Sequence, residues 1–110
     1  MERRSIICAV VIALGVAALA GCGQMPPVAT VADAERAHVE LADLHQGRKL
    51  LIRKCGNCHR PPLPAEHAPD VWPGKLDEMV VRSNLNAAQR AAIQQYLVTI
   101  AGRPAPVARK

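Results

Sequence analysis

Apolar residues recur at helical spacing in three stretches of this chain, and no stretch alternates as a half-buried strand would. The stretches run from about residue 37 to 54, from 71 to about 82, and from 87 to about 101. Residues three and four apart share one face of a helix, so each stretch predicts an amphipathic helix. A helical piece over residues 30–40 would add a fourth. We therefore expect an all-α fold of three to four helices. The apolar positions are Val39, Leu41, Leu44, Leu50, Leu51 and Ile52, then Leu76, Met79 and Val80, then Ile93, Tyr96, Leu97 and Ile100.

The ends of the predicted helices carry recognisable signals. Pro73 suits a first helical turn. Asn86 and Gln89, three residues apart, predict a capping box, and Gly102 predicts the end of the last helix. Gly47 lies inside a predicted helix, where a glycine costs about 1 kcal/mol relative to alanine. It indicates either a helix break or the close approach of another segment.

The first 21 residues predict an export signal. Arg3 and Arg4 precede an apolar run at residues 5–20. This run of about 16 residues is shorter than the roughly 20 that span a bilayer as a helix. It ends in LAGC at residues 19–22, which resembles the lipobox of bacterial lipoproteins. The resemblance implies cleavage before Cys22, acylation of Cys22 and a place on the periplasmic face of a bacterial membrane. Gly23, following the cysteine, favours the outer membrane by the same resemblance.

Composition changes divide the rest of the chain. Residues 23–30 contain two adjacent prolines and no apolar periodicity, and we expect residues 22–36 to be a lipid-anchored tether. Residues 37–103 form the predicted domain, and residues 104–110 a solvated tail. The chain contains one Trp, one Tyr and no Phe, so a domain of this size has little material for a core of its own.

The run CGNCH at residues 55–59 carries the candidate chemistry. A redox-active dithiol, a zinc site and a c-type haem attachment site are the alternatives. A thioredoxin-like dithiol needs a βαβ context, which is missing, and the adjacent ligands Cys58 and His59 fit one zinc tetrahedron poorly. C-x-x-C-H is the haem attachment pattern, with Cys55 and Cys58 as thioether anchors and His59 as the axial ligand. A covalent haem c would also fill the aromatic-poor core.

These residues together resemble a small class I, mono-haem cytochrome c domain. The resemblance rests on CGNCH, on Gly47 and Leu50 before it, and on Tyr96-Leu97 in the last helix, and it covers roughly residues 45–101. It implies a fold packed around one covalently attached haem. It also implies that the first helix crosses the last where a glycine meets an aromatic residue, here Gly47 and Tyr96.

The resemblance further implies a methionine as sixth iron ligand. Met79 is the methionine that follows His59 in the chain, although in better-known relatives this ligand lies in an extended loop and later. His67 and an open or water-ligated iron are the alternatives.

The same resemblance implies a proline carbonyl that accepts the imidazole Nδ1–H. Pro69 is our choice from the proline-rich loop at residues 60–73, and Pro61, Pro62 and Pro64 compete with it. Trp72 would either donate its indole N–H to a haem propionate or cover the haem edge. Tyr96, with Trp72 and Pro69, is a candidate residue of the haem pocket.

The predicted function is that of a periplasmic, membrane-anchored electron carrier and not a free-standing enzyme. A formal net charge of +5 favours acidic protein partners, and no basic run interleaved with aromatic residues indicates nucleic acid binding. A haem-based sensor or binder of small ligands, and an electron-entry subunit of a periplasmic oxidoreductase complex, are the alternative functions.

Overall fold

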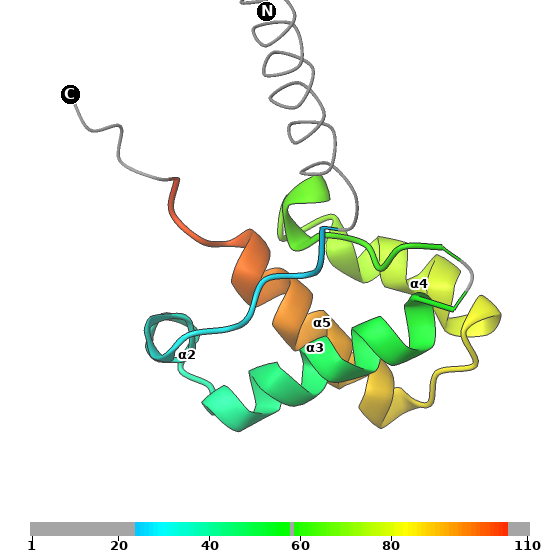
Figure 1. Ribbon diagram of the computed structural model, residues 1–110, viewed down its shortest axis with the longest axis horizontal. Helices are drawn as coiled ribbons and strands as arrows, with labels where there is room; N and C mark the ends of the chain where they lie inside the picture. The colour runs from blue at the N-terminus through cyan, green and yellow to red at the C-terminus, as the bar shows by residue number, and fades with distance from the viewer. Residues whose placement is uncertain (1–23, 58, 106–110) are drawn as a thin grey trace, which may run out of the picture.

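The computed structural model describes residues 24–57 and 59–105, and within these it is all-helical (Figure 1). The order is α2 (Val31–Ala37), α3 (Leu41–Cys55), the 3₁₀ turn η2 (Pro64–Glu66), α4 (Trp72–Arg82) and α5 (Ala87–Ala101). The all-α prediction is confirmed. The predicted signal peptide, Cys22, Cys58 and most of the predicted tail lie outside the described residues. No helix within the described ranges is long and apolar enough to cross a membrane.

The centre of the fold is the crossing of α3 and α5, which Figure 1 shows lying side by side. Gly47 is buried at this crossing. A Cβ added to it would lie 2.2 Å from the Ala92 carbonyl oxygen and 2.8 Å from Tyr96 Cβ. Helix α3 continues through Gly47 without a break. The expected meeting of Gly47 and Tyr96 is therefore confirmed, and the glycine is needed because the two backbones touch. Fully buried side chains around the crossing include Leu44, Leu51, Leu76, Ile93 and Leu97.

Both C-terminal helices begin and end as their sequence signals predict. The Asn86 side chain accepts a hydrogen bond from the Gln89 amide at 2.8 Å, and the Gln89 side chain accepts one from the Asn86 amide at 3.0 Å. This capping box starts α5. Pro73 lies in the first turn of α4. Helix α4 ends at Arg82, and a left-handed Asn84 (φ 51°) turns the chain into α5.

A single arginine of α5 fixes α4 in place. Arg90 donates to the Asp77 carboxylate at 2.6 Å and to the Pro73 carbonyl at 3.2 Å. Trp72 at the start of α4 is 1% exposed, and Leu76 on the next turn is fully buried. This packing sets the position of the following turn, which carries Met79.

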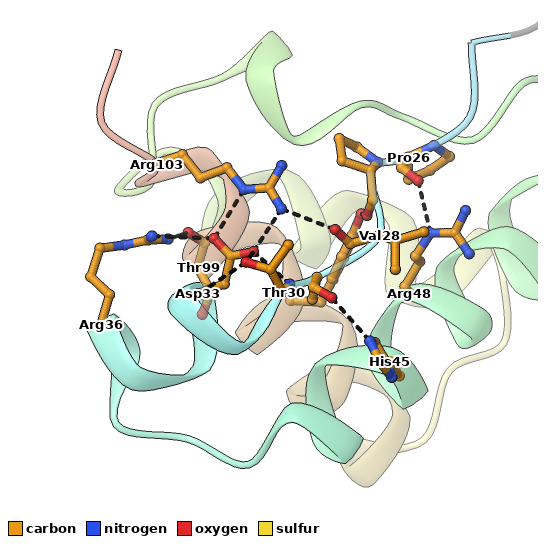
Figure 2. Close-up of polar contacts among 12 residues, drawn as sticks. Pro26, Val28, Thr30, Asp33, Arg36, His45, Arg48, Thr99 and Arg103 are labelled. Atoms are coloured by element: carbon orange, nitrogen blue, oxygen red, sulfur yellow. Dashed lines mark hydrogen bonds and ion pairs between the residues drawn. The ribbon is translucent and has the colours of Figure 1, made fainter. Parts of the chain in front are cut away.

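The structure contradicts the expected tether at residues 22–36. Residues 24–30, which we call the strap, lie along the domain, and Pro26 and Ala29 are buried. Side chains of α3, α5 and the segment after α5 donate to four consecutive strap carbonyls. Figure 2 shows the bonds from Arg48 to Pro26 and from Arg103 to Val28. The donors and acceptors are Arg48 to Pro26 (2.8 Å), Tyr96 to Pro27 (2.5 Å), Arg103 to Val28 (3.0 Å) and His45 to Ala29 (3.0 Å). The folded unit therefore begins before residue 37.

Helix α2 follows the strap and is a separate element, not an extension of α3. Left-handed His38 (φ 55°) divides the two. Asp33 in α2 is 2% exposed and accepts from Arg103 at 2.6 and 3.0 Å and from Arg36 at 3.2 Å. The Arg103 guanidinium holds the pKa of the Asp33 carboxyl well below its usual range. Arg36 also donates to the Thr99 carbonyl of α5 at 2.7 Å, so α2 is held at the C-terminal end of α5.

Candidate functional site

Three of the sequence-predicted site residues line one cavity. Cys55, His59 and Met79 surround a space of about 210 Å³ between the C-terminal end of α3, the chain after it and α4. Four further residues complete the lining, namely Lys54, Glu78, Arg82 and Ser83. The structure thus brings together residues that are 24 positions apart at the extremes, from Cys55 to Met79.

Cys55 is the last residue of α3 and its side chain is buried, with 4% of the residue exposed. Burial raises the pKa of the Cys55 thiol, and a hydrogen bond with Ser83 partly offsets this effect. A reactive redox thiol is exposed and has a lowered pKa, because the thiolate is the nucleophile. Cys55 has the opposite properties, which disfavour the dithiol alternative. Cys58 lies outside the described residues.

His59 is exposed, and its ring is held by one backbone contact. Nδ1 lies 2.7 Å from the carbonyl oxygen of Arg60. A carbonyl can only accept, so Nδ1 carries the proton and Nε2 keeps its lone pair for a metal. The partner is the next residue in the chain and not Pro69, our expected acceptor. Pro69 instead lies at the end of α5, where its Cγ would be 3.8 Å from a Cβ added to Gly102.

Met79 lies on α4, half-buried against the core, and faces the same cavity as Cys55 and His59. The alternative ligand His67 is not among the lining residues. Its ring packs edge-on against Trp72, with ring centroids 4.9 Å apart. The arrangement therefore favours Met79 over His67 as the second axial donor, because Met79 lines the same cavity as His59.

The roles expected for the two aromatic residues need correction. The Trp72 indole N–H donates to the Pro64 carbonyl at 3.0 Å, so it is not free for a haem propionate. Tyr96 is fully buried at the helix crossing and its hydroxyl donates to the strap. Burial raises the pKa of Tyr96 to about 12. Neither residue lines the cavity. Both hold the scaffold around it.

The sequence prediction missed the polar rim of the cavity. Lys54 and Arg82 bring two positive charges, and Ser83 contacts the Cys55 thiol. Helical spacing could have identified Arg82 and Ser83, because residues three and four after Met79 share its face. Lys54 could not be assigned in this way, because its role depends on where α4 meets α3.

Within residues 24–57 and 59–105, no group of three His, Cys, Asp or Glu residues is placed so that it could hold a metal ion. Cys55 and His59 belong to this part of the chain, whereas the third member of the motif, Cys58, does not.

A larger cavity of about 810 Å³ lies where α2, α3 and α5 meet. It is lined mainly by acidic and apolar side chains, with His38 as its imidazole. None of the described residues of the CGNCH motif or of α4 lines it, so the smaller cavity remains the candidate site.

Comparisons with protein-family models, with curated proteins and with solved structures find no match to this chain.

Proposed function

We propose that this chain is a periplasmic electron carrier that holds one c-type haem through Cys55 and Cys58, with His59 as the proximal ligand. The supporting observation is the cavity that Cys55, His59 and Met79 line together. A haem thiol anchor, an imidazole and a thioether are the donor types that cytochromes of this kind use. The proposal also assigns Met79 as the sixth ligand and Cys22 as the lipid-bearing residue.

The residues around the cavity fit such a group in charge as well as in donor type. Lys54 and Arg82 would offset the two carboxylates of haem, since opposite charges a few ångströms apart attract near a protein surface, and Glu78 is the acidic residue of the lining. The volume of about 210 Å³ is below the 300–1,000 Å³ usual for ligand pockets. A macrocycle would therefore extend beyond the cavity toward exposed His59 and Arg60.

The chain itself supplies attachment, orientation and exclusion of water. Each thiol would add across one vinyl double bond, which retains every atom. The His59 Nδ1–H bond to a carbonyl fixes the tautomer and raises the basicity of Nε2. On the core side, Leu51 and Leu76 are fully buried one helical turn before Cys55 and Met79 and exclude water there. Haem iron, when bound, supplies a one-electron redox centre whose potential depends on axial ligands and burial.

The test is the optical spectrum of the oxidised protein, made in cells that attach c-type haem. A weak far-red band, typical of methionine bound to iron(III), is expected in the unmodified chain and lost in Met79→Ala. The matched control Val80→Ala, one position along α4 and outside the cavity lining, should keep the band.

Other results would change the assignment. A haem spectrum without the far-red band, together with tight binding of carbon monoxide, would favour the small-ligand binder. A chain that carries no haem would contradict the proposal and return Cys55 and Cys58 to thiol or metal chemistry.

A further inference from the structure

The strap determines how far the domain can stand from a lipid at Cys22. Its carbonyls at Pro26, Pro27, Val28 and Ala29 are all bound to the domain. Only two peptide links separate Gln24 from Cys22. Two residues of fully extended chain reach at most about 7 Å. An acylated Cys22 would therefore hold Gln24 at the membrane surface, and with it the face of the domain that surrounds Gln24.

That face is apolar and hollowed. Gln24 lines a cavity of about 330 Å³ between the strap, η2 and the end of α5. Of the eight lining residues none is acidic and one, Arg103, is basic. The lining also includes Met25, Pro27, Leu63, Pro64, Ala65 and Ile100. Figure 1 shows the start of the strap beside η2, whereas the C-terminal end of α3 lies to the right.

Large apolar side chains are exposed on this part of the chain. Met25 is 51% exposed and Val28 is 59% exposed. Both residues belong to the strap, and Met25 also lines the cavity. We call the cavity together with Met25 and Val28 the docking face.

We infer that the docking face rests on the bilayer into which the acylated Cys22 inserts, so that the domain is seated on the lipid surface and does not swing on a tether. The inference rests on the proposed lipidation of Cys22. The short reach from Gln24 and the exposed apolar side chains of Met25 and Val28 both fit a lipid surface.

Contact of the docking face with the membrane would also position the proposed redox site. The strap meets α3 at His45 and Arg48, and Cys55 follows Arg48 by seven residues. At 1.5 Å per residue this places Cys55 about 10 Å along α3 from the strap contact. In this arrangement the cavity with Cys55, His59 and Met79 is held at a fixed distance from the membrane surface, for partners that lie on or in the same membrane.

The experiment measures hydrogen–deuterium exchange of the full lipidated chain in vesicles of phosphatidylethanolamine and phosphatidylglycerol. The reference is the Cys22→Ser chain in solution. The reporting amides are those of Met25, Val28 and Leu63 to Glu66 other than Pro64, because Pro26 and Pro27 have none. We expect slower exchange at these amides in vesicles. The double variant Met25→Asp/Val28→Asp should lose this protection. The matched control Val81→Asp, at an apolar side chain 84% exposed on α4, should keep it.

Equal exchange in vesicles and in solution, or protection on another face only, would overturn the inference. Protection that appears without vesicles and increases with protein concentration would assign the face to a second copy, which also overturns the inference.

The mass of the N-terminal peptide reports lipidation and the Soret band reports haem. A chain with haem but without lipid would overturn the docking inference alone. A protected docking face on a lipidated chain without haem would support docking and contradict the electron carrier.

Discussion

Replacing Gly47 with alanine tests the central packing of this fold. A Cβ at this position would lie 2.2 Å from the Ala92 carbonyl oxygen and 2.8 Å from Tyr96 Cβ. Both neighbours belong to α5 and one is backbone, so a side-chain rotation cannot relieve the contact. Helices α3 and α5 must separate or tilt.

The expected loss follows from two opposing terms. Ordinary carbon–oxygen contacts are about 3.3 Å, so the backbones must part by about 1 Å. A gap of that size forfeits about a quarter to a half of each dispersion contact that it opens, and over-packing of a core costs about 1–3 kcal/mol. Alanine regains about 1 kcal/mol of helix propensity. Near the upper end of the packing cost, the net destabilisation is about 2 kcal/mol.

Urea unfolding followed by circular dichroism measures this loss. Gly74→Ala is the matched control, because Gly74 also lies in a helix but an added Cβ would meet nothing within 4 Å. We expect Gly74→Ala to be neutral or stabilising by up to about 1 kcal/mol. A Gly47→Ala chain as stable as the parent would show that the close crossing of α3 and α5 is not required.

Three further substitutions test the polar contacts that hold the scaffold. Tyr96, with its pKa raised to about 12 by burial, stabilises the fold below its unfolded pKa of about 10, and this contribution is lost as the pH rises from about 10 to 12. Tyr96→Phe should cost about 1 kcal/mol at neutral pH and abolish the alkaline loss in a pH series of urea melts. Asp33, whose pKa Arg103 lowers, stabilises the fold above its unfolded pKa of about 3.9 and loses this effect as the pH falls. Asp33→Asn should cost about 1–3 kcal/mol at pH 7 and flatten the acid limb of the same series. Trp72→Phe leaves the Pro64 carbonyl without its donor and should cost about 1–3 kcal/mol in urea melts, and an unchanged midpoint would refute the role given to this hydrogen bond.

The helices and their ends could be predicted from the sequence because local chemistry specifies them. The Asn86 and Gln89 capping box, Pro73 in a first turn and the stop near Ser83 all depend on neighbours within four residues. The contact at Gly47 could also be predicted from the sequence, because a glycine inside a helix indicates a close neighbour and the family resemblance suggested Tyr96.

The strap could not be predicted because its structure is set by distant donors. Pro26 and Pro27 exclude regular helix, so the sequence of the strap resembles that of a linker. Arg48, Tyr96 and Arg103 lie 22, 69 and 75 residues from the carbonyls they bind. No local pattern carries that information.

The same limit explains the misassigned site residues. Trp72 and Tyr96 were expected near a haem from the family resemblance, yet the Trp72 indole donates to the Pro64 carbonyl and the Tyr96 hydroxyl to the Pro27 carbonyl. Pro69 was chosen by spacing, and a nearer carbonyl, that of Arg60, contacts His59. By contrast, the helical spacing of Leu76 and Met79 predicted that Met79 faces inward, and Met79 lines the cavity.

Covalent haem on Cys55 and Cys58 is the central claim, and the mass of the chain tests it most directly. The full chain should be produced in cells that attach c-type haem, denatured, and its peptides measured with their optical absorbance. We expect one haem that survives denaturation on the peptide containing residues 55–59 and is absent from the Cys55→Ser/Cys58→Ser chain. An unmodified peptide with both thiols free, from cells that attach haem to a control cytochrome, would contradict covalent haem attachment.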